Sequence, residues 1–320
     1  MPPHDRDKGF RNLHIKPQRK GLVSFLRMRF FAGQWPDYAA GAGRVARVAA
    51  ALDKIHAPRN GLQTTWIGHA TVLVQVGGIN ILTDPVFSER ASPLSFYGPK
   101  RAAPPALTLA QLPLIHLILI SHDHYDHLDE RAARRLGERP VWVTPLGYRR
   151  TLARFGVQHV VECDWWQRWQ LQGAVITATP SQHWTGRGLR DRYRALWASW
   201  AVQVGDFRFW FAGDTGYDDR IFKEIGMRCG PFDLALIPVG GYEPRPFMKD
   251  MHVNPEEAVA IHRDVGSRYS LGIHWGTFPL TAEPIDEPPR RLREAARSLM
   301  GSRFVTCALG ETLTIPLHHN

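Results

Sequence analysis

The nine residues SHDHYDHLD, at positions 121–129, directly follow the apolar run LPLIHLILI and limit how the chain can fold. Placing three histidines and three aspartates close together costs free energy unless they bind a common partner. His122 and His124 are two residues apart, so in an extended segment both side chains point the same way. Asp126 and His127 follow at once and offer an oxygen and a nitrogen to a second point in space. Imidazole and carboxylate ligands together predict zinc or another borderline divalent ion, and two ions would need a shared bridging ligand.

Further candidate ligands stand where predicted strands end. Four apolar segments, each predicted to be a strand, end in His122, His183, Asp214 and His274. Side chains at the carboxyl ends of neighbouring strands meet at one crevice of an α/β sheet. Each partner alone is ambiguous, because a single histidine is more often a hydrogen-bonded loop residue and Asp214 could merely cap a turn. Together with the complete HxHxDH motif, these residues predict a metal centre.

The chain reads as two successive halves of mixed strands and helices in one compact domain. Strand patterns begin near residue 62 with LQTTWIG, TVLVQV and INILT, the last two joined by a Gly-Gly turn. Helices are expected within residues 21–31 and within the alanine-rich residues 43–55, and the proline-rich residues 84–105 predict a long loop. We therefore expect a basic N-terminal extension, 1–60, followed by a catalytic domain, 61–320.

The positive charge lies mainly in the predicted extension. Residues 1–60 hold twelve Lys and Arg against four Asp and Glu, which is +8 of the net +10, so the remaining 260 residues carry only +2. A near-neutral body argues against a nucleic-acid partner. The basic residues beside the apolar stretch 21–31 are Lys16, Arg19, Lys20, Arg27 and Arg29. They predict an arm that adsorbs to an anionic membrane surface, with packing of the same segment on the body as the alternative.

The cysteines and the apolar runs bear on the cellular compartment. Cys163, Cys229 and Cys307 are odd in number and widely spaced, which argues against a disulfide framework and fits a reducing environment. The first residues carry no apolar signal segment, and the longest apolar run is about half of what a membrane span needs. We expect a cytoplasmic protein that is peripheral on the inner face of a membrane.

Longer stretches around the candidate ligands are similar to one known family. The motifs TWIGHATVLV, LTDPVFSERASP, GPKR, ISHDHYDHLD, DWW, PSQHW, FAGDTGY, GPFDLALIPVG, YEPRPFMK, HVNPEEAV and IHWGTF occur in this order between roughly residues 62 and 290. They resemble the N-acylphosphatidylethanolamine-hydrolysing phospholipase D family of the metallo-β-lactamase superfamily. The resemblance is weak in the first 60 residues and near the C-terminus. It implies an α/β fold, the αββα four-layer sandwich, with two Zn²⁺ ions as cofactors.

The resemblance also divides the ligands between the two ions. It implies one ion held by His122, His124 and His183, a second held by Asp126, His127 and His274, and Asp214 as the bridge between them. Asp214 and Asp126 are therefore expected to be catalytic as well as metal-binding. His252, in HVNPEEAV, is expected to contact the phosphate or the leaving group.

The implied activity is that of a zinc-dependent phosphodiesterase of phospholipase D type. Its substrate would be N-acylphosphatidylethanolamine, and its products N-acylethanolamine and phosphatidic acid. Alternatives are another hydrolase of the same superfamily, a lactonase or a nuclease, and a non-catalytic protein that binds membrane surfaces. A nuclease would carry basic charge around its cleft, and a decayed site would lack ligands that are all present here. The sequence leaves open the acyl-chain preference and whether the chain forms a homo-oligomer.

The sequence departs from relatives of this family at three positions. Asp123 stands within the motif where relatives carry asparagine, Met251 replaces a polar residue, and Leu309 stands where a relative has histidine. The first change adds negative charge beside the metals, whereas the other two bear on substrate contacts. Asp84 and His69 are expected to orient ligand histidines, with turn stabilisation as the alternative role.

Overall fold

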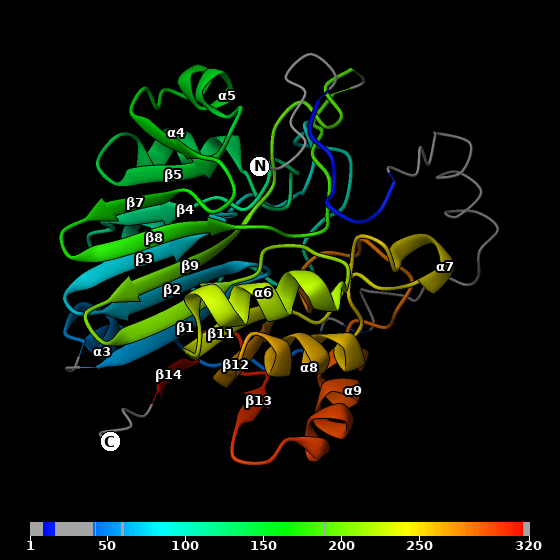
Figure 1. The fold of residues 1–320 in the computed structure, drawn as a ribbon. Coiled ribbons are helices and arrows are strands. Elements are labelled where there is room, and N and C mark those ends of the chain that lie inside the picture. Colours follow the sequence, from blue (N-terminus) through cyan, green and yellow to red (C-terminus); the bar gives the residue numbers. More distant parts are fainter. Residues whose placement is uncertain (1–8, 17–40, 42, 59–60, 189, 316–320) are drawn as a thin grey trace.

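The computed structural model describes residues 9–16, 41, 43–58, 61–188 and 190–315. Within this part of the chain, two seven-stranded mixed sheets pack face to face (Figure 1). The first sheet has the order β14-β1-β2-β3-β4-β5-β6, and the second has the order β13-β12-β11-β10-β9-β8-β7. Apart from β14, the N-terminal half of the chain builds the first sheet and the C-terminal half builds the second. The two predicted halves are therefore confirmed.

The strands of the first sheet are β1 (Leu62–Gly68), β2 (Thr71–Val76), β3 (Ile79–Thr83), β4 (Leu117–Leu119), β5 (Val141–Pro145), β6 (Val160–Cys163) and β14 (Thr312–Ile315). Those of the second sheet are β7 (Arg168–Leu171), β8 (Ala174–Thr179), β9 (Ser199–Val204), β10 (Phe207–Phe211), β11 (Phe232–Pro238), β12 (Ser267–Ile273) and β13 (Arg303–Val305). The helices are α3 (Leu52–His56), α4 (Glu130–Leu136), α5 (Arg149–Arg154), α6 (Asp219–Cys229), α7 (Arg245–Met248), α8 (Pro255–Asp264) and α9 (Glu287–Ala295), with single 3₁₀ turns at Leu109–Gln111 and Ala296–Ser298.

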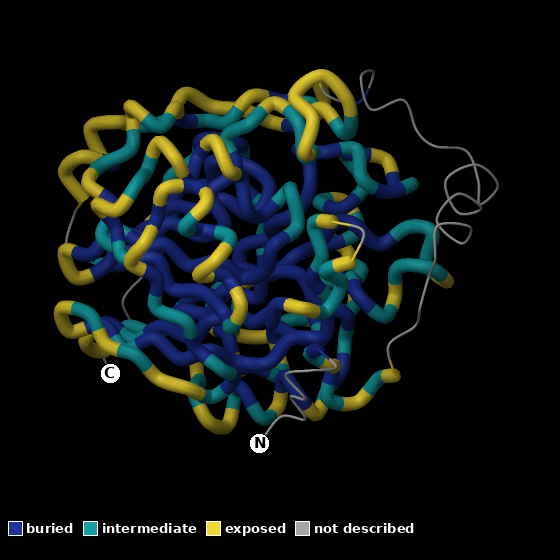
Figure 2. Tube along the Cα trace, turned by 90° about the horizontal axis from the view of Figure 1, so that it is seen from above, coloured by how far each residue is buried: buried dark blue, intermediate teal, exposed yellow. Residues whose placement is uncertain are grey.

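The alternation of side chains along the first sheet explains why the fold has four layers. Val72 and Val74 of β2 point into the core between the sheets, whereas Leu73 points to the opposite face and packs in a second core with residues of α4 and α5. Both faces of this sheet are therefore buried, and buried residues fill the interior of the molecule (Figure 2). Helices α6, α8 and α9 lie over the outer face of the second sheet (Figure 1). The predicted αββα sandwich is confirmed.

The strands that carry the candidate ligands do not all belong to one sheet. Strand β4 lies in the first sheet, whereas β8, β10 and β12 lie in the second, where each is separated from the next by one strand. The expectation that four neighbouring strands converge on one crevice is therefore wrong in detail. Their carboxyl ends meet instead at one edge of the sandwich, where the two sheets face each other. Burial between the sheets brings these ends together.

Part of the predicted extension packs on the body. The alanine-rich residues 43–55 are helical only at Leu52–His56. Arg47 instead forms a parallel bridge with Leu309, and the Val48 N–H donates to the Leu309 carbonyl. This tertiary pairing overrides the helix propensity of the alanines. The helix expected within residues 21–31 and, apart from Lys16, the basic residues of the predicted membrane arm lie outside the described residues. The domain boundary at residue 60 stays a prediction.

In the part of the chain that the structure describes, none of the helices has both the length and the apolar character that crossing a bilayer requires. The long loop expected over residues 84–105 is confirmed, with an isolated bridge between Arg90 and Lys100 inside it.

Candidate metal centre

The loop between β4 and α4 carries four of the candidate ligands. Asp129 ends the loop and caps α4 by accepting a hydrogen bond of 2.9 Å from the Arg131 N–H. The Arg187 guanidinium lies against the Tyr125 ring, 4.0 Å from its centroid, and donates hydrogen bonds of 2.7 Å to the carbonyls of Asp123 and Leu128. These contacts fix the shape of the loop between its two ends, so its side chains are held where the ligands must converge.

Three imidazoles gather on one side of the centre. Nδ1 of His124 lies 2.9 Å from Nε2 of His122 and 3.3 Å from Nε2 of His183. Together they form one of the groups of candidate ligand atoms whose mutual separations are below 4.8 Å. His122 comes from the loop after β4 and His183 from the loop after β8, so this group joins the two sheets.

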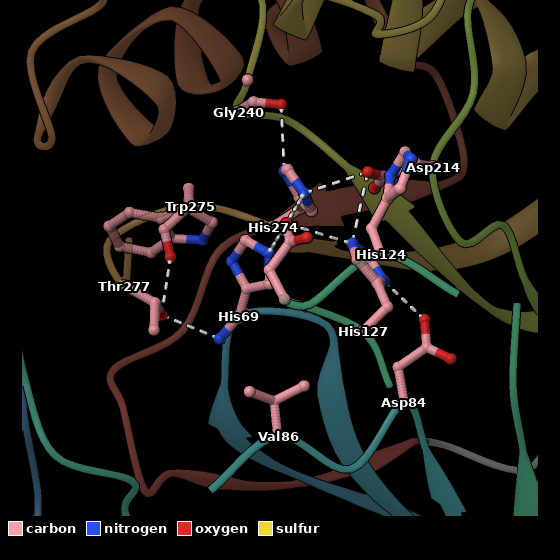
Figure 3. Close-up of polar contacts among 12 residues, drawn as sticks. His69, Asp84, Val86, His124, His127, Asp214, Gly240, His274, Trp275 and Thr277 are labelled. Atoms are coloured by element: carbon pink, nitrogen blue, oxygen red, sulfur yellow. Dashed lines mark hydrogen bonds and ion pairs between the residues drawn. The ribbon is translucent and has the colours of Figure 1, made fainter. Parts of the chain in front are cut away.

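A second group lies beside the first. It consists of Asp126, His127 and His274, with His69 at its edge, and its ligand atoms are also mutually within 4.8 Å. Nε2 of His127 and Nε2 of His274 are each 3.5 Å from the Asp126 carboxylate. Figure 3 shows His127 and His274 directed toward Asp214.

Asp214 lies between the two groups. Its Oδ2 atom is 3.2 Å from Nε2 of both His127 and His274, and 3.8 Å from Nε2 of both His122 and His183. The carboxylate thus faces members of both groups, as a bridging ligand would. His252 lies beside it, with Nδ1 3.8 Å from the same oxygen.

The outward-facing Nδ1 atoms of four histidines each contact a fixed polar group. Nδ1 of His127 lies 2.6 Å from Oδ2 of Asp84, and Nδ1 of His122 lies 2.9 Å from Oγ of Ser121. The other two contact main-chain carbonyls: Nδ1 of His183 lies 2.9 Å from the Met251 oxygen, and Nδ1 of His274 lies 3.3 Å from the Gly240 oxygen. A proton on each Nδ1 leaves the Nε2 lone pair directed at the centre, which is the tautomer a metal ligand needs. The Ser121 hydroxyl itself donates to Asp84, so one buried carboxylate orders two of the rings.

Burial and charge set the protonation of the two groups differently. Burial lowers the pKa of His124 and of His183 to about 3 and holds that of His122 well below its ordinary value, so these rings are neutral. Burial also acts to lower the pKa of His274, but Asp214 and Asp126 outweigh it and raise that pKa to about 9. The same two carboxylates raise the pKa of His127 well above its ordinary value, against the effect of its burial.

The carboxylates respond in the opposite direction. Burial alone acts to raise the pKa of Asp126 and of Asp214, but the His127 imidazole and its neighbours hold both pKa values well below the usual range. Both groups therefore stay ionised, which is the form that coordinates a cation. Asp84 differs, because burial raises its pKa in spite of the hydrogen bonds from His127 and Ser121.

The main chain at the centre adopts conformations that side chains rarely accept. The φ angles of His69, Asp84 and His274 are +54°, +30° and +61°, and such left-handed residues store strain that clusters at functional sites. Gly213, with φ +60°, stands just before Asp214, and a Cβ atom there would collide with the Ser121 side chain. Glycine at this position therefore lets the ends of β10 and β4 approach closely enough to share ligands.

The polar atoms around the centre fit a bound cation. Among the described residues, Nε2 of His127, Nε2 of His274 and Oδ1 of Asp214 are buried and form no hydrogen bond. Leaving such atoms unpaired costs about 1–3 kcal/mol each, whereas a metal ion would satisfy them. All seven ligands predicted from the sequence, and His252, lie together. Their roles as metal ligands and catalytic groups stay predictions, as does the division between two ions.

Other residues of the centre were not predicted. Ser121 and Arg187 position the motif loop, and a buried Asn12 contacts His183. Ser121 could have been suspected because it directly precedes the motif, whereas nothing local marks Arg187 or Asn12. Asp123 is buried and accepts a hydrogen bond of 2.8 Å from the Gly186 N–H. Burial raises its pKa to about 6.

Comparison with known proteins identifies the family of this chain. Residues 79–275 match the family model of the beta-lactamase superfamily domain. The chain is similar to N-acyl-phosphatidylethanolamine-hydrolyzing phospholipase D 1 of Caenorhabditis elegans, with 46% identity over 275 residues that cover 81% of this chain and 77% of that one. It is also similar to the mitochondrial N-acyl-phosphatidylethanolamine-hydrolyzing phospholipase D of Saccharomyces cerevisiae, with 35% identity over 77% of this chain and 56% of the yeast protein.

A solved structure shares the fold. Igni18, a metallo hydrolase from Ignicoccus hospitalis, aligns with a TM-score of 0.59 and 21% identity, covering 80% of this chain and 99% of its own. The four-layer sandwich, the clustered His and Asp side chains and the identity to the nematode and yeast enzymes lead to one assignment. The chain belongs to the beta-lactamase superfamily and, within it, to the N-acylphosphatidylethanolamine-hydrolysing phospholipase D family.

Proposed function

We propose that this protein is a binuclear zinc phosphodiesterase that hydrolyses N-acylphosphatidylethanolamine. Water would enter at phosphorus, the bond between phosphorus and the ethanolamine oxygen would break, and the products would be N-acylethanolamine and phosphatidic acid. The observation that carries the proposal is the 46% identity to the nematode enzyme over 77% of that protein's length. The candidate ligands lie within that family's pattern of motifs.

In this proposal, His122, His124 and His183 hold one ion, Asp126, His127 and His274 hold the other, and Asp214 bridges them. Zinc ions bound there would supply Lewis acidity to a phosphate oxygen and lower the pKa of water, so that hydroxide is available at neutral pH. Nitrogen and oxygen ligands in this number suit two zinc ions better than one, because a single structural zinc takes four ligands.

The protein's own residues prepare this site in three ways. Asp84 holds His127 with its Nε2 atom directed inward, and His69, whose Nε2 atom is 3.0 Å from Asp126, holds that carboxylate in turn. Burial keeps bulk water from competing with a bound phosphate. His252 stands 3.8 Å from Asp214, where its imidazole would hydrogen-bond a phosphate oxygen or the leaving oxygen.

A lipid-class panel with purified protein tests the proposal. N-acylphosphatidylethanolamine, phosphatidylethanolamine, phosphatidylcholine, an acyl-homoserine lactone and a single-stranded oligonucleotide are incubated separately, and products are resolved by mass spectrometry. We expect N-acylethanolamine and phosphatidic acid from the first substrate alone. Release of diacylglycerol, or cleavage of the lactone or the oligonucleotide in preference to the lipid, would rule out the proposed reaction.

Asp214→Asn supplies the negative control and a prediction of its own. Because this carboxylate would contact both ions, the variant should lose turnover while its circular dichroism spectrum stays unchanged. Activity within about tenfold of the unmodified protein corresponds to a barrier change of only about 1.4 kcal/mol, which is too small for a bridging ligand. Asp206→Asn, in the exposed turn between β9 and β10, is the matched variant that should keep full activity.

A further inference from the structure

Asn12 pairs with the main chain of a predicted metal ligand that lies 171 positions further along the sequence. Its side-chain Nδ2 donates to the His183 carbonyl at 2.9 Å, and its Oδ1 accepts from the His183 N–H at 3.0 Å. Asn12 is only 5% exposed and His183 is fully buried. One primary amide thus satisfies both polar groups of one residue, and removing it would leave a buried N–H and a buried carbonyl without partners.

The two contacts of His183 restrict different parts of the residue. Its ring is oriented by the hydrogen bond from Nδ1 to the Met251 carbonyl, which directs Nε2 toward His124 and Asp214. That bond alone leaves the main chain free to shift and carry the ring with it. The Asn12 amide fixes the main chain, so the position of Nε2 depends on both contacts.

The neighbours of Asn12 attach the same segment to a second ligand loop. The Phe10 N–H donates to the Tyr193 carbonyl at 2.8 Å. His14 lies with Nδ1 2.8 Å from the carboxylate of Asp218, which is four residues beyond Asp214 and caps α6. Residues 10–14 therefore contact the loop that carries His183 and the loop that carries Asp214.

The two loops are also joined to each other at this point. The Gln182 N–H donates to Oγ1 of Thr215 at 2.9 Å, and the Gly216 N–H donates to the Gln182 carbonyl at 2.8 Å. Residues 10–14 lie across this junction, with the buried Asn12 amide on the His183 side and the partly buried contact between His14 and Asp218 on the other. A segment in this position resists movement of either ligand away from the centre.

We propose that Asn12 is a positioning residue for His183, and that residues 10–14 form a clasp that holds the two ligand loops of the second sheet in their metal-binding arrangement. The inference rests on the proposed binuclear centre and not on the identity of the lipid substrate. It assigns a role at the site to a part of the chain that reads, from sequence, only as a basic extension.

Metal affinity tests the clasp without any lipid. Zn²⁺ is titrated into the metal-stripped full-length protein against a chromophoric chelator, and one dissociation constant is fitted for each of the two sites. In Asn12→Ala we expect the constant of the site that contains His183 to rise by about 10–100-fold, as for other groups that orient a ligand, while the other changes less than about threefold. Arg11→Ala is the matched control, because Arg11 is the exposed neighbour in the same segment and both constants should remain unchanged.

Thermal unfolding of the metal-stripped protein separates positioning from general stability. Unchanged zinc constants in Asn12→Ala overturn the clasp, and so does an equal weakening of both sites accompanied by a lower melting temperature. If Asn12→Ala does not fold, Asn12→Ser, which keeps a small hydrogen-bonding side chain, is judged by the same two criteria. An unmodified protein that binds fewer than two zinc ions refutes the binuclear centre itself, so the two failures are distinguishable.

Discussion

The Asp84 carboxylate lies 2.6 Å from Nδ1 of His127, and both side chains are fully buried. The same carboxylate accepts hydrogen bonds from the N–H and the hydroxyl of Ser121. It therefore connects β3 to the loop after β4 through charge-assisted contacts. Asp84 stands where INILTD ends, and its expected role of orienting a ligand histidine is consistent with this geometry.

We expect Asp84→Asn to lower zinc affinity and kcat/KM by about 10–100-fold each. The amide cannot carry the negative charge that holds the His127 proton on Nδ1, so the ring loses its fixed tautomer and orientation. The measurement is a chelator competition combined with steady-state hydrolysis. Asp206→Asn serves as the control, because it makes the same chemical change at an exposed turn. Full zinc affinity in Asp84→Asn would mean that the carboxylate stabilises the turn and does not orient His127.

Metal analysis after mild dialysis should find close to two zinc ions per chain. Seven predicted protein ligands exceed the four that one tetrahedral ion takes. The check is elemental analysis of protein purified without added metal, compared with Asp214→Asn prepared in parallel. A ratio near one, or iron in place of zinc, contradicts the binuclear proposal.

Zinc binding should release protons and become tighter as pH rises. In the metal-free centre, Asp214 and Asp126 raise the pKa of His274 to about 9 and that of His127 above its ordinary value. Both rings are therefore protonated at neutral pH, and zinc must displace those protons. Each displaced proton makes the apparent affinity rise by about tenfold per pH unit, until the pH exceeds the pKa of the ring.

Calorimetry in buffers that differ in ionisation enthalpy measures the number of protons released. We expect a value above one near pH 7 that falls as the pH approaches about 9. His56→Ala, which removes an exposed histidine far from the centre in sequence, should leave this value unchanged. An affinity that is constant over the same pH range would mean that these imidazoles are already neutral without metal.

A structural feature could be predicted from the sequence when the residues that produce it are neighbours in the chain, and not when they are far apart. Strands β2 and β3 could be predicted because successive residues point to opposite faces of the sheet, and apolar residues on both faces indicate burial. The HxHxDH loop could be predicted because its candidate ligands are adjacent in the sequence. Strand β14 was missed, since Thr312–Ile315 becomes a strand only by pairing with β1, some 250 positions earlier. The amphipathic helix α6 was not predicted either, although Ile221, Phe222 and Ile225 form its buried face. Asn12 has no local signal, because its partner is defined by tertiary structure.

Neutralising the basic residues of the N-terminal segment should weaken binding to anionic vesicles. Lys16, Arg19, Lys20, Arg27 and Arg29 would each contribute about 1 kcal/mol at a negatively charged surface. Replacing all five by glutamine is preferable to deleting residues 1–31, because deletion also removes Asn12. We expect co-sedimentation to fall sharply at low salt, while hydrolysis of a short-chain monomeric substrate changes little. Equal vesicle binding by the substituted protein would refute the membrane arm.

Because Asp214 lies between candidate ligands from both sheets, synthesis and folding of the chain must precede completion of the metal site. His122 lies in the first half of the chain and His274 directly after β12, so a nascent chain holds only part of the predicted ligand set until β12 and the residue after it have been made. A partial site offers zinc fewer ligands than the complete one. Metal capture would therefore follow the docking of the second sheet on the first, and a chain truncated before residue 274 would be made without its full complement of metal.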